Sequence, residues 1–183
     1  MTSHTKAGRN GLLGLLAAVA LFLAVQWFRE DATLAPGERP IVPHPELFQQ
    51  ANACAGRGRA LENGRRSEEL ALLRADRYPY DARDGVRAVQ HYREAESCYL
   101  TAGAEAEAAR IHRANAALMA RVNTDYAAAR LNLANALEQE RWLDALSEIR
   151  RLLLLTQHVR RNEYVEWLNQ TIGRVAARAS TAP

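Results

Sequence analysis

The stretch NALEQERWLDALSEIRRLLLL, residues 135–155, decides the fold class. It contains neither glycine nor proline, and after residue 141 its apolar side chains recur at steps of three and four residues. Because an α-helix turns once in about 3.6 residues, this spacing gathers them on one face. The pattern predicts a helix that buries this face and presents the other as a surface. The buried face comprises Trp142, Ala145, Leu146, Ile149, Leu152 and Leu153.

The same periodicity continues from Pro45 to the end of the chain, and no segment alternates as a strand would. Glycine, proline and helix-capping residues mark the breaks between helices. These marks are Gly64, Ser67, Tyr78–Tyr80 around Pro79, Gly103, and Asn123–Asp125. We therefore predict an all-α domain over residues 46–180, with helices at 45–63, 67–77, 84–101, 105–122, 126–140, 141–155 and 162–178.

Residues 1–28 are typical of a membrane anchor. An uncharged run extends from Gly11 to Phe28, and as a helix it is about 27 Å long, enough to cross the core of a bilayer. Trp27 lies at its outer end, where an aromatic ring suits the headgroup level. The alternative is a cleaved signal peptide, but the small residues that cleavage requires are poorly placed after the run. We expect a transmembrane signal-anchor helix that stays attached.

The charges that flank the run predict its orientation. Lys6 and Arg9 precede it without an acidic neighbour, whereas Arg29 on the far side is followed at once by two acids. Since positive residues favour the cytoplasmic side, the N-terminus is expected in the cytoplasm. In a bacterium, the helix would lie in the inner membrane and the helical domain in the periplasm. Residues 29–45 hold four of the six prolines and read as an extended linker.

The charge balance does not favour nucleic acid as a partner. The chain carries a net charge of +3, and from Pro45 onward 20 arginines are offset by 18 acidic residues. Domains that bind nucleic acid usually concentrate positive charge on one face. We therefore expect a mixed, solvated surface and no nucleic-acid partner.

Two stretches resemble the tetratricopeptide repeat. They are EAESCYLTAGAEAEAARIHRANAAL at 94–118 and RLNLANALEQERWLDALSEIRRLL at 130–153. In this family a first helix carries small and aromatic residues at set steps, and an alanine lies early in the second helix. The matching residues are Tyr92, Ala95, Tyr99, Gly103 and Ala108 in the first copy, and Leu133, Ala134, Leu137, Trp142 and Ala145 in the second.

The resemblance implies a short α-solenoid of antiparallel helix pairs. The repeats would span residues 86–122 and 125–156, and residues 162–178 would form a capping helix. A lone helix pair cannot bury its apolar face, so neighbouring pairs stack. Stacking leaves a concave surface, lined by the first helix of each pair, on which the family usually holds peptides or partner helices.

Polar residues that face out of the first helices are candidates for partner binding. Their amide and guanidinium groups suit the backbone or the acidic groups of an extended peptide. The alternative for each of them is an ordinary exposed side chain. The candidates are Gln90, Arg93, Ser97, Asn132 and Asn135.

Cys54 and Cys98 are the two cysteines of the chain. In an oxidising compartment they could form a disulfide, which would close a loop of about 45 residues and stabilise the fold by about 3–4 kcal/mol. The alternative is two small thiols buried between helices, where cysteine packs well. Neither a CxxC nor a CxxCH motif occurs, so thiol redox catalysis and haem attachment find no support.

No constellation of reactive residues indicates an enzyme, and we expect no metal, no cofactor and no small-molecule substrate. His91 and Cys98 are two helical turns apart, about 10 Å, which is too far to share one metal ion unaided. Glu105 and Glu107 are two residues apart and so face different sides of a helix. Nucleophile-elbow and phosphate-loop motifs do not occur.

Two hypotheses for function follow from this organisation. The first is a membrane-anchored periplasmic interaction or scaffold module, which supports the assembly of an envelope complex by binding other envelope or membrane proteins. The second is a structural accessory subunit of a large membrane complex, held mainly by its transmembrane helix.

Overall fold

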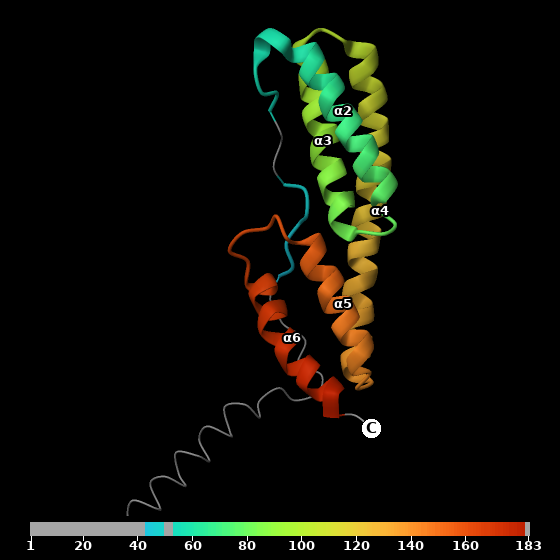
Figure 1. Cartoon of the computed structure of the whole chain (residues 1–183), viewed down its shortest axis with the longest axis vertical. Coiled ribbons are helices and arrows are strands. Elements are labelled where there is room, and N and C mark those ends of the chain that lie inside the picture. The colour runs from blue at the N-terminus through green and yellow to red at the C-terminus, as the bar shows by residue number, and fades with distance from the viewer. Residues whose placement is uncertain (1–42, 50–52, 182–183) are drawn as a thin grey trace, which may run out of the picture. The chain divides into compact units, whose positions relative to one another are not determined.

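The computed structural model of the chain describes residues 43–49 and 53–181, all within one unit that spans Arg39–Pro183 (Figure 1). The described residues form helices and no strands, which confirms the all-α prediction for this part of the chain. The helices are a single 3-10 turn η1 (Arg57–Arg59), α2 (Ala60–Arg77), α3 (Ala82–Thr101), α4 (Glu105–Glu138), α5 (Trp142–Leu155) and α6 (Glu163–Thr181).

Helix α4 is one continuous helix of 34 residues, so the predicted break at Asn123–Asp125 is wrong. None of its residues is glycine or proline, and nothing forces the backbone out of the helix. Thr124 turns its hydroxyl back to the carbonyl of Ala120 at 3.0 Å. The Asp125 carboxylate accepts a hydrogen bond from the Tyr78 hydroxyl instead of capping a helix. The polar triplet therefore lies inside a helix of about 50 Å.

Two apolar cores share helix α4, whose two halves lie beside different helices (Figure 1). The first core lies between α2, α3 and the N-terminal half of α4, and is built mainly from small and aromatic residues. The second lies between the C-terminal half of α4, α5 and α6. The first comprises Ala71, Tyr92, Ala95, Tyr99, Ala108 and Ile111. The second is centred on Val122, Tyr126, Leu133, Ala145, Leu146, Ile149, Leu152, Leu155, Tyr164 and Leu168, which confirms the predicted buried face of residues 142–155.

Helix α2 begins at Ala60, so the predicted helix from Pro45 to Gly64 is wrong. Residues 43–49 contain no helix, and both Gly64 and Ser67 lie inside α2 rather than at its ends. Gly64 lies close to the ring of Tyr99, where a Cβ would be 3.1 Å from Cδ1. The glycine thus permits close approach of α2 and α3 and does not stop a helix.

The turn between α2 and α3 follows the prediction that residues 78–80 break the helices. Asp81 caps α3 by accepting a hydrogen bond from the backbone N–H of Arg83 at 3.0 Å. Gly85 lies against the ring of Tyr78, where a Cβ would be 2.3 Å from Cδ2. Gly103, with φ of +72°, lies in the turn that follows α3, as predicted.

The predicted anchor at residues 11–28 and most of the linker lie outside the described residues. Among the helices that the structure describes, none combines the length and apolar character needed to span a membrane.

Candidate functional site

An N-terminal segment without α-helix, residues 43–49 and 53–56, contacts α3, the helix that was expected to line the binding surface (Figure 1). Leu47 is only 4% exposed and belongs to the second core, with Phe48 packed beside it. The segment is therefore an integral part of the domain, although it is not α-helical and does not extend α2.

Arg93 of α3 holds this segment through its backbone and its aromatic ring. The guanidinium Nη1 donates to the carbonyl oxygen of Phe48 at 3.0 Å, and the guanidinium carbon lies 5.6 Å from the centroid of the Phe48 ring. On the other side of the segment, Nε2 of His158 lies 2.7 Å from the carbonyl oxygen of Leu47. Since a carbonyl can only accept, His158 carries a proton on Nε2.

A disulfide joins Cys54 of the segment to Cys98 of α3, with 4.7 Å between their Cα atoms. The backbone N–H of Cys54 also donates to the hydroxyl of Ser97 at 3.1 Å. Asn63 of α2 donates to the carbonyl oxygens of Ala55 and Gly56. Three neighbouring contacts thus fix this end of the segment to α2 and α3.

The five predicted binding residues do not form one surface. Arg93 and Ser97 hold the chain's own N-terminal segment, whereas Gln90 lines a cavity nearby. Asn132 and Asn135 are exposed on the C-terminal half of α4, and their side chains pair with Glu148 at 3.4 Å and Gln139 at 2.7 Å. No local pattern predicts the N-terminal segment in this place, apart from the cysteine pair that fastens it.

The cavity beside Gln90 has a volume of about 270 Å³ and lies where α3 approaches the end of α5. Its lining combines two apolar side chains with amides and cationic groups, and no carboxylate. We call it the α3–α5 groove. It is lined by Arg83, Val86, Arg87, Gln90, Leu154, Gln157 and His158.

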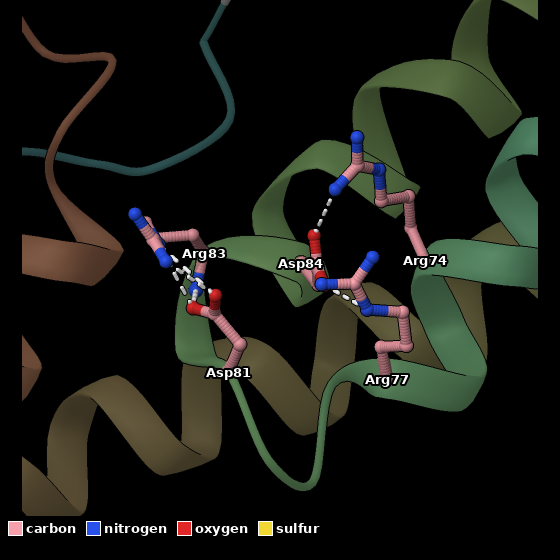
Figure 2. A network of polar contacts seen from close by, with 5 residues as sticks. All are labelled: Arg74, Arg77, Asp81, Arg83 and Asp84. Atoms are coloured by element: carbon pink, nitrogen blue, oxygen red, sulfur yellow. Dashed lines mark hydrogen bonds and ion pairs between the residues drawn. The ribbon is translucent and has the colours of Figure 1, made fainter.

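The two arginines of the α3–α5 groove differ in their surroundings. Arg83 folds back on Asp81, with 2.7 Å between Nη2 and Oδ2, and the hydrogen bond from Arg83 holds the pKa of Asp81 below its usual value (Figure 2). Arg87 is exposed, and no carboxylate of the described residues forms an ion pair with it. Arg87 is thus the cation in the groove best placed to meet an external anion.

A charge cluster around the buried Asp84 fixes the α2–α3 turn next to the groove. Figure 2 shows the Asp84 carboxylate directed at Arg74 and Arg77, away from the pair formed by Asp81 and Arg83. Asp84 is 1% exposed and accepts from Nη1 of Arg74 at 2.6 Å, and Nε of Arg77 lies 3.1 Å from its other oxygen. Asp84 also lies in the first turn of α3, where a negative charge complements the helix dipole. The cluster therefore has a structural role, and it sets the position of Arg83 and Arg87 on α3.

The geometry provides no reactive constellation in the described part of the chain. No group of three or more His, Cys, Asp or Glu side chains there could hold a metal ion. Two histidines each have one carboxylate neighbour: His91 of α3 lies 3.7 Å from Glu94, and His112 of α4 lies 2.9 Å from Glu96.

Comparison with known proteins gives no relative from which a role could be transferred. No protein-family model, no curated protein and no solved structure matches the chain.

Proposed function

We propose that the chain is a membrane-anchored periplasmic interaction module, whose α3–α5 groove binds an acidic segment of another envelope protein. In this role it would support the assembly or organisation of an envelope complex. Its binding residues would be Arg87 and Gln157, with Arg83 held beside them by Asp81.

The observation that carries the proposal is the chemistry of the groove. Its charged lining is cationic, Gln157 offers an amide that suits a peptide backbone, and Leu154 provides apolar surface. A peptide with carboxylates can form charge-assisted hydrogen bonds with guanidinium groups. Because arginine stays charged at any physiological pH, this recognition would not depend on protonation of the site.

The tether and the compartment are supported by the sequence of the N-terminal region and by the disulfide. The uncharged run at 11–28 follows positive residues, which favours an anchor with a cytoplasmic N-terminus. A disulfide between Cys54 and Cys98 suits an oxidising compartment such as the periplasm. A reporter fused after Pro183 tests the orientation, and activity of a cytoplasm-specific reporter there would contradict it.

We further propose that the domain is a short tetratricopeptide-like array in which two repeats share one helix. The first repeat would pair α3 with the N-terminal half of α4, and the second would pair the C-terminal half of α4 with α5. Each half of α4 contributes to a different core, so each proposed repeat packs its own helix pair, whereas stacked repeats bury one continuous core. The departures from the family are this division of the core and the missing turn between the repeats.

Binding of a model acidic peptide to the full-length protein in detergent micelles tests the groove. We expect fluorescence anisotropy to show binding of labelled hexaglutamate but not of hexaglutamine. Arg87→Glu should weaken hexaglutamate binding roughly tenfold or more, because it places a like charge in the site. Arg113→Glu on the exposed face of α4 changes the net charge equally and should have little effect. Equal losses in the two variants would mean that binding is non-specific and would overturn the proposal.

The accessory-subunit hypothesis is separated from this proposal by an exchange of the anchor. If residues 11–28 are replaced by an unrelated transmembrane helix, an interaction module keeps its partners in native membranes. A subunit held by its own membrane helix loses them.

A further inference from the structure

Helix α2 carries its large apolar side chains on the outside of the domain. Its buried face consists of Ala60, Gly64, Ser67 and Ala71, which are all small. Three leucines point outward instead: Leu61 is 40% exposed, Leu72 is 49% exposed and Leu73 is 56% exposed. The outer side of α2 thus carries apolar side chains near both of its ends, with charged residues between them.

The charges between these leucines change sign along the helix. Arg65 follows Leu61 by four residues, and Glu69 precedes Leu72 by three. Both are exposed, and neither takes part in an ion pair within the described part of the chain. Glu68, by contrast, points inward to Arg110 and is not part of this surface.

The outward face of α2 complements the same face of a second copy of the chain when the two helices run antiparallel. At about 100° per residue, Leu61, Arg65, Glu69, Leu72 and Leu73 lie within an arc of about 120°, which also takes in the exposed Glu62 and Asp76. An antiparallel pairing centred at position 67 brings Leu61 of one copy level with Leu73 of the other, and Leu72 level with Glu62. It also brings Arg65 of each copy level with Glu69 of the other. We call this surface the α2 outer face: Leu61, Arg65, Glu69, Leu72 and Leu73.

We infer that the α2 outer face binds the same face of a second copy of the chain, in a two-fold symmetric, antiparallel helix pair. A closed dimer uses one patch twice, so that each contact between unlike residues occurs twice. The two Arg65–Glu69 contacts meet this condition, and the leucines at both ends supply the apolar contact. A parallel pair would place Arg65 against Arg65 instead. The anionic surface of a membrane would oppose the acidic residues of the same face, Glu62 and Glu69.

Charge reversal provides a test in which two defective variants should repair each other. Full-length copies that carry a donor or an acceptor dye at the C-terminus are mixed in detergent, with empty micelles in excess, and energy transfer is measured against concentration. Arg65→Glu or Glu69→Arg should each raise the dissociation constant roughly tenfold or more, because like charges then face each other. A mixture of the two single variants should recover the transfer, and so should the double variant R65E/E69R.

The matched control is Arg113→Glu, which should leave the transfer unchanged. Helix content by circular dichroism and an intact Cys54–Cys98 bond verify that each variant is folded. The absence of concentration-dependent transfer in the unaltered chain would overturn the dimer. Energy transfer that is unchanged in both charge-reversal variants would also overturn it, and association through the N-terminal region would give that result. Energy transfer that stays low in the mixture of the two single variants would overturn it as well. Hexaglutamate binding by Arg65→Glu reports on the α3–α5 groove separately, so the two proposals can fail independently.

Discussion

Nη1 of Arg93 donates a hydrogen bond to the backbone carbonyl of Phe48, 45 residues earlier in the chain, at 3.0 Å. A residue expected to hold a peptide from a partner thus holds a peptide of its own chain. The same guanidinium lies over the Phe48 ring and within 3.4 Å of the sulfur of Met119 on α4. Arg93 therefore connects the N-terminal segment to two helices at once.

We predict that Arg93→Ala loosens the N-terminal segment without unfolding the helices. The loss of a charged donor should lower the free energy of unfolding by about 1–3 kcal/mol. Hydrogen exchange followed by mass spectrometry should show faster exchange in residues 43–49 and unchanged exchange in α5. Arg113→Ala, on the exposed face of α4, serves as the control. Unchanged exchange in residues 43–49 would contradict the assigned role.

Removal of the disulfide should weaken the domain more strongly. Cys54 and Cys98 are 44 positions apart, and a crosslink that closes such a loop stabilises a fold by about 3–4 kcal/mol through the unfolded chain. The double variant C54S/C98S should lose about this much in urea unfolding of the full-length protein. The reduced unaltered chain should lose a similar amount. Equal unfolding midpoints with and without the bond would refute this prediction.

Two glycines should respond to alanine in opposite directions. Gly85 in α3 leaves no room, since its Cβ would lie 2.3 Å from the Tyr78 ring, and we expect Gly85→Ala to destabilise the fold by about 1–3 kcal/mol. A Cβ at Gly173 in α6 would meet no atom of the described residues within 4 Å outside its own stretch of helix. Gly173→Ala should therefore stabilise the fold by about 0.5–1 kcal/mol, because alanine has the higher helix propensity. Thermal unfolding of the two variants side by side measures both signs. Destabilisation by both would show that helix propensity does not govern α6.

Helices α3, α5 and α6 could be predicted from local signals, because those signals act within one or two turns. The buried face of residues 142–155 follows from apolar side chains spaced three and four residues apart, which an α-helix gathers on one side. Pro79 and Gly103 lie at two of the predicted breaks, and both breaks occur as predicted.

The errors occur where tertiary contacts decide between local alternatives. Asn, Thr and Asp are favoured as helix caps, but at 123–125 they are also tolerated within a helix that is packed at both ends. Gly64 reads as a stop until the ring of Tyr99, 35 residues later, is placed against it. The position of residues 43–49 depends on contacts with Arg93 and His158, far along the chain, which no local pattern records.

The buried carboxylate of Asp84 should be needed for stability. Asp84→Asn would leave Arg74 and Arg77 without their counter-charge, while the amide remains nearly isosteric. Because both arginines retain access to water, we expect a loss of about 1–3 kcal/mol, less than for a fully buried pair. Urea unfolding measures the loss. The control is Asp144→Asn, which removes a charge from an exposed ion pair with Arg141. It should change the free energy of unfolding by less than about 0.5 kcal/mol. A smaller loss for Asp84→Asn than for the control would contradict the role of the cluster.

The pH dependence of stability should reveal the contacts of Glu68, which connects three helices. Its carboxylate accepts from Arg110 of α4 at 2.6 Å and 2.9 Å and from the hydroxyl of Tyr99 of α3 at 2.6 Å. The hydrogen bond from Arg110, with that from Tyr99, holds the pKa of Glu68 below its usual value, although burial acts in the opposite direction. The unfolded chain then takes up the proton at a higher pH than the folded one. The stabilisation is therefore complete above the ordinary glutamate pKa of about 4.3 and is lost as the pH falls through the lower, folded value.

We predict that Glu68→Gln is less stable than the unaltered chain at pH 7, by about 1–2 kcal/mol, since it removes a charged acceptor. The difference should shrink as the pH is lowered from about 5 to about 3, where the unaltered carboxylate becomes protonated as well. Urea unfolding of both proteins across this range measures the difference at each pH. Glu105→Gln, at an exposed position in the first turn of α4, should show a much smaller difference at pH 7. A gap between Glu68→Gln and the unaltered chain that stays constant from pH 7 to pH 3 would show that the charge of Glu68 does not hold the three helices together.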